Sequence, residues 1–213
     1  KKYNVIGVMS GTSVDGLDIS FCRFIEKKKW KYEILNSKTY HYCNFWKKTL
    51  INLHLENEKK IKEIDLEFAK HISNKINHFV KKNKIKADII SSHGHTVFHD
   101  PSKKITLQIG SGKVINELCK ITTVNNFRKI DIDLGGQGAP LVPIGDKLLF
   151  QQYKYCLNIG GFANLSVKGN NSIKAFDICP ANIAINFYCR KLGKEFDSGG
   201  EISRSGNMIK SLY

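Results

Sequence analysis

A polar, glycine-containing turn between two apolar strand-like runs occurs twice in this chain, and the repeat constrains the fold more than any other feature. The first copy spans residues 3–22, YNVIGVMSGTSVDGLDISFC, where apolar residues recur at period two on the return from SGTSVDG. The second copy spans residues 155–168, YCLNIGGFANLSVK, and turns at Gly160–Gly161. A further strand-like run follows each copy, at residues 31–40 and 172–177. One such turn is typical of an ordinary β-hairpin, whereas the repeat indicates a duplicated α/β domain.

The first turn has the composition of a phosphate-binding loop. Gly, Thr and Ser present backbone N–H groups and hydroxyls without a bulky side chain to hold an anion away. Asp15 and Asp18 stand where a carboxylate can reach a phosphate-bound Mg²⁺ directly or through water. Two such turns that hold one phosphate chain from both sides are similar to the arrangement in actin-like, sugar-kinase and heat-shock chaperone ATPases.

The composition indicates a folded protein. The chain has 213 residues and a hydrophobic fraction of 41%, with 12 Phe and 8 Tyr, which is enough for a substantial core. No apolar run approaches the ~20 residues that a membrane helix needs, and no signal-peptide pattern opens the chain, so we expect no membrane partner. The chain begins with Lys rather than Met, which is consistent with a trimmed N-terminus. Six cysteines without a CxxC pair or zinc spacing favour a reducing cytoplasm.

The net charge of +15 raises the question of nucleic-acid binding. Arg accounts for only four of the 34 basic residues, however, whereas base and phosphate recognition usually rely on Arg. The Lys residues are spread over segments without interleaved aromatic residues, such as 27–29, 59–60 and 81–86. We therefore expect a solvated lysine-rich surface and no nucleic-acid partner, with nucleic-acid binding as the weaker alternative.

Apolar periodicity predicts alternating helices and strands after the first three strands. Residues 61–80 carry apolar side chains at three- and four-residue steps, which predicts a long amphipathic helix. Short strands are expected at 88–91, 105–109 and 121–124. The polar segment 92–101 between the first two of these strands is expected to be a loop.

Two further helices are predicted from their starting residues. Ser111 can cap a helix that runs to about Lys120. The apolar residues of this helix that are expected in the core are Val114, Ile115 and Leu118. Pro180 suits the first turn of a helix over residues 181–192.

The glycine- and proline-rich segment at residues 127–143, FRKIDIDLGGQGAPLVP, is the best candidate for a domain crossover. We therefore expect one domain over residues 1–130. The crossover and the N-terminal part of a second domain are expected over residues 131–213. Because helices and strands alternate, the predicted fold class is α/β.

Seven motifs occur in a fixed order along the chain. They are GVMSGTSVDGLD, SHGHTVFHDP, LQIGSG, FRKID with GGQGAPLVP, LNIGGFANLS, FDICPAN and FDSGGEISRSG. Together, over residues 5–206, they strongly resemble the anhydro-N-acetylmuramic acid kinase family of the actin-like sugar-kinase superfamily. The resemblance implies an actin-like ATPase fold, which is ribonuclease H-like, with two similar domains of which the second is incomplete in this chain.

The resemblance also implies an ATP- and Mg²⁺-dependent cytoplasmic kinase of cell-wall recycling that forms a homodimer. In the family reaction, water opens the internal ring of anhydro-N-acetylmuramic acid while the 6-oxygen takes the phosphoryl group, giving N-acetylmuramic acid 6-phosphate. The nucleotide-binding residues that the resemblance implies here are Gly11, Thr12, Ser13, Val14, Asp15, Gly16, Leu17, Asp18, Gly160, Gly161 and Asn164.

Asp177 aligns with the family's general base, which accepts a proton from the attacking water. A carboxylate within hydrogen-bond reach of that water contributes about 10²–10⁴-fold to the rate. The residues alone favour a different role, because an Asp between a strand and Pro180 can cap the helix that follows. With the resemblance, the role of base is favoured.

Thr96 and Arg128 are the expected sugar-binding residues, since Arg offers a planar fork of donors to the sugar carboxylate or ring oxygens. His93, His95 and His99 lie in the same segment as Thr96 and raise the alternative of a metal site. Their spacings of two and four residues, without Cys or Glu nearby, disfavour that alternative. The metal ligands stay unassigned.

Several positions depart from the family pattern. Ile178, Cys179 and Ala181 stand where the family motif FD-T-G-P-G-N has Thr, Gly and Gly, and the added atoms of Cys179 and Ala181 can narrow the approach of the backbone to substrate. His95 stands where Gln is usual, and both side chains can donate and accept hydrogen bonds. Ser111 replaces a common acidic or Asn position.

The chain stops at Tyr213, before the later glycine-rich turn that holds adenosine in the superfamily. We therefore expect a fragment of a longer kinase and an isolated 213-residue chain that is inactive. The alternative is a non-catalytic nucleotide-binding module of the same fold, for nucleotide sensing or as a scaffold. A gene that ends near residue 213 would favour this alternative.

Overall fold

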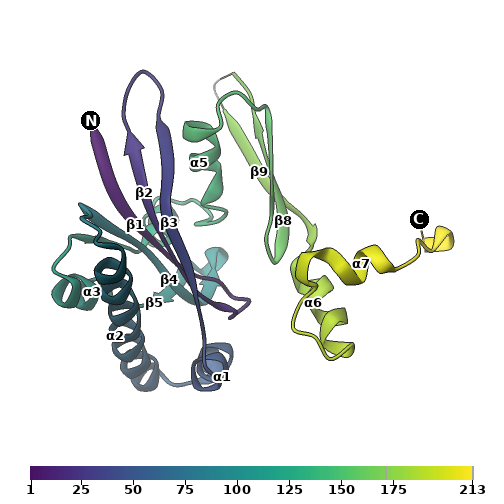
Figure 1. Cartoon of the computed structure of the whole chain (residues 1–213), viewed down its shortest axis with the longest axis horizontal. Coiled ribbons are helices and arrows are strands. Elements are labelled where there is room, and N and C mark those ends of the chain that lie inside the picture. Colours follow the sequence, from purple (N-terminus) through teal and green to yellow (C-terminus); the bar gives the residue numbers. More distant parts are fainter. Residues whose placement is uncertain (171, 213) are drawn as a thin grey trace. The chain divides into compact units, whose positions relative to one another are not determined.

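A computed structural model of the chain describes residues 1–170 and 172–212 and divides the chain into two compact units, Lys1–Gln151 and Gln152–Tyr213 (Figure 1). The boundary expected after residue 130 falls inside the first unit. The reason is that α4 (Phe127–Asp133) and α5 (Val142–Leu149) both contact strands of the first sheet. None of the helices in the described residues has the length and apolar character to span a membrane.

The first unit is built on a mixed six-stranded sheet. Its strands are β1 (Lys2–Ser10), β2 (Gly16–Ile25), β3 (Lys31–His41), β4 (Ile89–Asp100), β5 (Ile105–Ile109) and β6 (Thr123–Val124). The order is β3-β2-β1-β4-β5, and β6 also pairs with β4. The pairs β1–β4 and β4–β6 are parallel and the others are antiparallel. The three strands expected at the N-terminus are confirmed.

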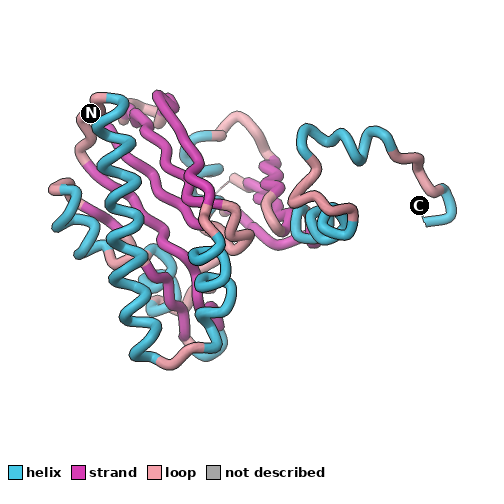
Figure 2. Tube along the Cα trace, turned by 60° about the horizontal axis from the view of Figure 1, so that its bottom comes forward, coloured by secondary structure: helices cyan, strands magenta, loops and turns pink. Residues whose placement is uncertain are grey.

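Helix α2 (Glu58–Asn83) supplies most of the core that covers this sheet, and Figure 2 shows it lying along one face of the strands. Its N-cap residue is Asn57, whose side chain accepts a hydrogen bond from the Lys60 amide at 2.9 Å. Its buried apolar stripe consists of Ile61, Ile64, Phe68, Ile72, Ile76 and Phe79. The stripe joins a cluster that includes Ile6, Leu17, Ile19 and Ile90 from the sheet. The helix predicted over residues 61–80 is confirmed.

The helices before and after α2 are shorter. Helix α1 (Asn44–Asn52) and the 3-10 turn η1 (Leu53–Leu55) precede it, and α3 (Gly112–Cys119) follows β5. Ser111 occupies the N-cap position of α3, but its side chain makes no cap hydrogen bond. Asp65 of α2 instead accepts hydrogen bonds from the amides of Gly110 and Ser111 at 2.6 and 2.9 Å. Ile115 is buried as expected, whereas the prediction for Leu118 is wrong because its side chain is 47% exposed.

Segment 92–101 is not the loop that its polar sequence predicts. Most of it belongs to β4, which continues to Asp100 and is followed by the 3-10 turn η2 (Pro101–Lys103). The segment pairs with β1 as far as His95 and then with β5 from His95 to Asp100. These partners satisfy its backbone and bury Ser92, Gly94 and His95, so tertiary pairing overrides the polar composition.

The second unit repeats the three-stranded meander of the first. Strands β7 (Tyr155–Ile159), β8 (Phe162–Lys168) and β9 (Ile173–Pro180) are antiparallel in the order β7-β8-β9. They are followed by α6 (Asn182–Lys191), the 3-10 turn η3 (Ser198–Gly200), α7 (Glu201–Ser205) and the 3-10 turn η4 (Lys210–Leu212). The expected helix over 181–192 is confirmed, but Pro180 is the last residue of β9 and pairs with Phe162, so it does not start the helix.

Candidate active site

The first glycine turn joins β1 to β2 and separates exposed polar side chains from buried apolar ones. Thr12 and Ser13 are exposed and make no hydrogen bond within the described part of the chain. Val14 and Leu17 point the other way and belong to the hydrophobic core of the first unit. The turn therefore presents the hydroxyls of Thr12 and Ser13 to solvent, while its apolar residues anchor it in the hydrophobic core.

Backbone constraints fix the shape of this turn. The Val14 amide donates a hydrogen bond to the Gly11 carbonyl oxygen at 3.1 Å, and Val14 has a positive φ of 57°. Gly16 is buried against β3, where a Cβ atom would lie 2.7 Å from the Tyr40 carbonyl oxygen. A side chain at position 16 would therefore force β2 and β3 apart. Of the expected nucleotide-binding residues, Val14, Gly16 and Leu17 can meet a ligand only through their backbones.

Asp15 and Asp18 are both exposed but are held differently. The Asp18 carboxylate accepts a hydrogen bond from the Thr39 hydroxyl at 2.5 Å. The Asp15 carbonyl oxygen accepts from the Tyr42 amide at 3.4 Å, whereas its carboxylate makes no hydrogen bond within residues 1–170 and 172–212. Mg²⁺ is usually bound by one or two carboxylates together with substrate phosphates, and the free Asp15 carboxylate fits that requirement.

The second glycine turn stands beside a polar row that crosses the second sheet. Asn158 of β7 lies opposite Asn164 of β8, which lies opposite Asp177 of β9. Directly opposed residues project to the same face of a sheet, so the structure brings the expected residues Asn164 and Asp177 together. A register shift leaves Ile178 as an extra residue between Asp177 and Cys179, which pairs with Ala163. Such bulges re-aim neighbouring side chains and are common next to active sites.

Asp177 does not cap the helix that follows it. It lies within β9, and the N-cap position of α6 is Ala181, which makes no side-chain cap hydrogen bond. The Asp177 side chain is exposed and has no hydrogen-bond partner among the residues that the structure describes. The helix-cap alternative for Asp177 is therefore wrong.

The backbone amides at the start of α6 donate hydrogen bonds to carbonyl oxygens of the second glycine turn. The Asn182 amide donates to the Gly160 carbonyl oxygen at 3.1 Å. The Ala181 and Ile183 amides donate to the Gly161 carbonyl oxygen at 2.8 and 3.2 Å. The turn is thus tied to the start of α6 by three backbone hydrogen bonds.

Arg128 is held in a fixed orientation at the start of α4. Its Nε donates to His93 Nε2 at 2.9 Å and its Nη1 donates to the Gly138 carbonyl oxygen at 2.6 Å. His93 Nδ1 lies 3.0 Å from the Gly94 carbonyl oxygen. Burial lowers the pKa of His93, which keeps the ring neutral and able to accept from Arg128. Nη2 of Arg128 has no partner in the described residues and remains available to a ligand.

Thr96 and the three histidines do not form a metal site. Thr96 is half-buried on β4 opposite Gln108, and its hydroxyl makes no hydrogen bond in the described part of the chain. His93 contacts Arg128, His95 contacts Ser10 and His99 contacts Thr106. Among residues 1–170 and 172–212, no three His, Cys, Asp or Glu side chains are grouped so that they could hold a metal ion.

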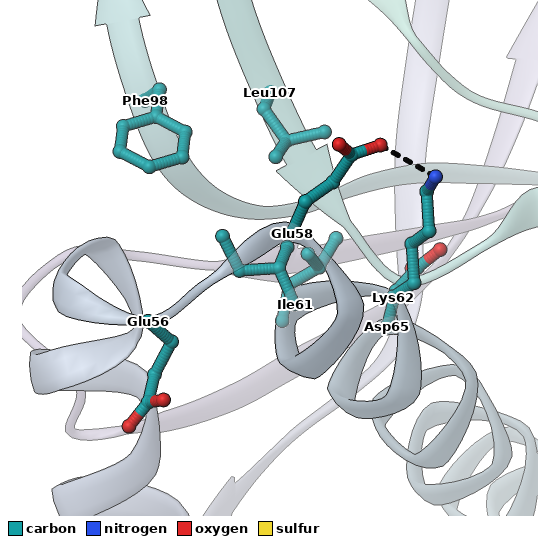
Figure 3. A pocket seen from close by; sticks show the side chains of 8 residues that line it. Glu56, Glu58, Ile61, Lys62, Asp65, Phe98 and Leu107 are labelled. Carbon is teal, nitrogen blue, oxygen red and sulfur yellow. Dashed lines mark ion pairs between the residues drawn. The ribbon is translucent and has the colours of Figure 1, made fainter.

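A separate pocket of about 350 Å³ lies between α2 and the β4–β5 pair (Figure 3). Its apolar wall consists of Ile61, Phe98, Leu107 and Ile109, and its rim carries Glu56, Glu58, Lys62 and Asp65. Glu58 and Lys62 form an exposed ion pair, which lowers the pKa of Glu58. None of the residues expected to bind nucleotide or sugar lines this pocket.

Sequence reasoning missed polar residues whose partners are distant in the chain. Asn158 joins the row with Asn164 and Asp177, and its sequence signal is an Asn at an otherwise apolar position of the strand CLNIG. Ser10 and Tyr42 lie directly under the first turn, joined by a hydrogen bond between their hydroxyls. No local motif marks that pair, because β2 and β3 separate the two residues in the sequence.

The fold and these features define a mixed α/β protein with two strand–glycine turn–strand units. The family model for anhydro-N-acetylmuramic acid kinase matches residues 3–213, and the chain belongs to this family. The chain is 34% identical over 224 residues to the anhydro-N-acetylmuramic acid kinase of Pelagibacter ubique strain HTCC1062, covering 97% of this chain and 59% of that protein.

Bacillus proteins of the same name are similar at a comparable level. The anhydro-N-acetylmuramic acid kinase of Bacillus thuringiensis subsp. konkukian strain 97-27 is 31% identical over 229 residues, covering 98% of this chain and 60% of that protein. The protein of that name from Bacillus cereus strain AH820 gives the same values. The chain thus spans about 60% of the length of the curated relatives it matches. These relatives carry the name of a kinase and give no support to a non-catalytic module.

Proposed function

We propose that the protein is an ATP-dependent kinase that opens anhydro-N-acetylmuramic acid and phosphorylates its 6-oxygen, giving N-acetylmuramic acid 6-phosphate for cell-wall recycling in the cytoplasm. The observation that carries the proposal is the family match over residues 3–213. The exposed side chains of Thr12, Ser13, Asp15 and Asp177 support it, because they have no hydrogen-bond partner in the described residues and are available to a ligand.

We further propose an actin-like fold with ATP and an amino sugar as its small-molecule partners. Leaving aside the hairpin strand β5, the first sheet has the order β3-β2-β1-β4-β6, with the first three strands antiparallel and the last two parallel to β1. The meander β7-β8-β9 followed by α6 repeats the first three strands and their helix. This repetition supports two similar domains of which the second is represented in part.

The first turn is assigned to the phosphates of ATP. Phosphoryl transfer depends mainly on positioning and on neutralising charge, which calls for small donors without bulk. Thr12 and Ser13 supply hydroxyls and amides, and Asp15 supplies the carboxylate that would hold Mg²⁺. Bound Mg²⁺ supplies positive charge that offsets charge on the phosphate oxygens.

Asp177 is assigned as the general base and Arg128 with Thr96 as sugar contacts. Water adds across the anhydro bridge and loses a proton to the Asp177 carboxylate. The bond between carbon and the bridging 6-oxygen breaks, and that oxygen takes the phosphoryl group as ADP leaves. Arg128 presents its remaining donors to the sugar carboxylate from an orientation fixed by His93 and Gly138.

The complete protein is expected to phosphorylate anhydro-N-acetylmuramic acid in the presence of ATP and Mg²⁺. Coupled ADP release measures turnover, and mass spectrometry of the product identifies a sugar that has gained both water and a phosphoryl group. A folded, complete protein that phosphorylates glucose or glycerol but not the anhydro sugar would contradict the assignment and leave only the superfamily-level activity.

Replacing Asp15 by Asn is expected to weaken Mg²⁺-dependent ATP affinity by about tenfold, because the variant loses an unpartnered carboxylate beside the phosphate turn. Titration calorimetry with and without Mg²⁺ measures the change. Glu63→Gln is the matched control, since Glu63 is an exposed acidic residue of α2 that pairs with Lys60, away from the first turn in sequence. If Asp15→Asn binds Mg²⁺-ATP as tightly as Glu63→Gln, Asp15 has no role at the metal.

A further inference from the structure

A buried hydrogen-bonded trio lies directly beneath the first glycine turn. The Tyr42 hydroxyl donates to Ser10 Oγ at 2.8 Å, and Ser10 Oγ lies 3.0 Å from His95 Nδ1. Ser10 is the last residue of β1, Tyr42 follows β3, and His95 lies within β4. The three residues are 1%, 4% and 3% exposed, so water does not compete for these hydrogen bonds.

The direction of each proton follows from the donor inventory. The Tyr42 hydroxyl gives its one proton to Ser10, because burial raises the pKa of Tyr42 to about 12 and keeps it protonated. Ser10 then has its own proton left for His95 Nδ1. Burial lowers the pKa of His95 to about 4, so the ring is neutral. The ring also hydrogen-bonds the backbones of Leu50 and Ser10.

The trio defines one orientation for Ser10. Its hydroxyl contacts Tyr42 on one side and His95 on the other, which restrains the Ser10 side chain from both sides. The Tyr42 ring is itself held among aromatic residues, with its centroid 6.1 Å from those of Phe68 and His71. A core that only needed packing would use apolar side chains here, since burying polar groups is costly unless every one is satisfied.

Ser10 is followed directly by Gly11, the first residue of the turn. Hydrogen bonds that fix the position of Ser10 therefore also fix where the turn begins. The buried Val14 side chain anchors the other end of the Gly11–Asp15 segment, and the Val14 amide closes it onto the Gly11 carbonyl. The trio and Val14 together hold the segment from below, which leaves the unpartnered Thr12 and Ser13 directed outward. We propose that Ser10, Tyr42 and His95 are positioning residues that hold the Gly11–Asp15 segment in its phosphate-binding conformation, an inference that rests on the proposed function.

His95 has a conservative replacement that can test this role. Gln offers one acceptor oxygen and two N–H donors, so like a neutral His it can accept from the Ser10 hydroxyl and donate to a backbone carbonyl. Leu fills a similar volume with neither group. The proposal therefore expects His95→Gln to retain nucleotide affinity within about threefold of wild type, and His95→Leu to lose about tenfold.

The decisive comparison is between two buried serines. Ser10→Ala removes the centre of the trio, whereas Ser73→Ala removes an equally buried hydroxyl that bonds the Ala69 carbonyl oxygen at 2.7 Å within α2. Melting temperature and the dissociation constant for a non-hydrolysable ATP analogue with Mg²⁺ are measured for both variants of the complete protein. We expect similar losses of thermal stability, and a dissociation constant raised about tenfold for Ser10→Ala alone.

The outcomes separate this inference from the proposed function. Wild-type protein that binds the nucleotide, with equal affinity in Ser10→Ala and Ser73→Ala, overturns the positioning role and leaves the kinase proposal standing. The same holds if His95→Leu binds as well as His95→Gln. Wild-type protein that does not bind the nucleotide at all overturns the proposed function, and the positioning role with it.

Discussion

Replacing Asp177 by Asn is expected to lower turnover by at least ~10²-fold while leaving ATP affinity nearly unchanged, because the variant keeps the shape of the side chain but loses the proton acceptor. The carboxylate is exposed on β9, lies opposite Asn164 and has no hydrogen-bond partner in the described residues. Steady-state kinetics of the complete protein and calorimetry with ATP measure the two effects separately.

The structure gives this experiment a clear interpretation. Because Asp177 lies within β9 and Ala181 is the N-cap residue, a loss of turnover is not explained by a weakened helix α6. Glu201→Gln is a suitable control, since Glu201 is an exposed carboxylate of α7 in the same unit. Near-normal turnover in Asp177→Asn would mean that another group accepts the proton from water.

Replacing Gly94 by Ala is expected to lower the free energy of unfolding of the first unit by about 2–4 kcal/mol. Gly94 has a φ of 71°, which L side chains rarely adopt, and an added Cβ atom would collide with the Ile109 carbonyl oxygen on β5. The β4–β5 ladder would have to open to accommodate it. Urea denaturation followed by circular dichroism measures the change.

Gly145→Ala provides the matched control. Gly145 lies in α5, and a Cβ atom there would meet no heavy atom within 4 Å. Because Ala is the better helix former, this variant is expected to be unchanged or more stable by about 0.5–1 kcal/mol. Equal stabilities of Gly94→Ala and Gly145→Ala would contradict the steric constraint at the start of the β4–β5 pair.

Local patterns predicted the elements whose signals are local. The meanders β1–β3 and β7–β9 follow from glycine turns between strand-like runs, and α2 follows from its apolar stripe. The extension of β4 through residues 92–100 was missed because its partners, β1 and β5, are distant in sequence and bury the polar side chains of Ser92 and His95. Helix α5 was missed because it begins within the glycine- and proline-rich segment 127–143 that is typical of a crossover, and only its packing on the first sheet reveals a helix.

The sequence predicts which residues belong to the candidate site, but it does not predict how strand pairing arranges them. The exposed hydroxyls of Thr12 and Ser13 follow from the composition of the first turn. The placement of Asp177 opposite Asn164 depends on the register of the β8–β9 pair, which alternation alone does not fix. The extra residue Ile178 shifts that register by one for Cys179 and Pro180. Which residues support the first turn depends on a contact between β1 and β4, which are parallel and far apart in sequence.

The alternation of outward and inward side chains in the first turn limits how such a loop can be transplanted. Thr12, Ser13 and Asp15 are exposed, but Val14 and Leu17 between and after them fill the hydrophobic core. Copying the exposed residues onto an ordinary hairpin would reproduce their chemical groups. It would not reproduce the core contacts of Val14 and Leu17 that orient the loop. A designer who wants this loop in another scaffold must bring the underlying core positions along, so the smallest portable unit is the loop together with the layer beneath it.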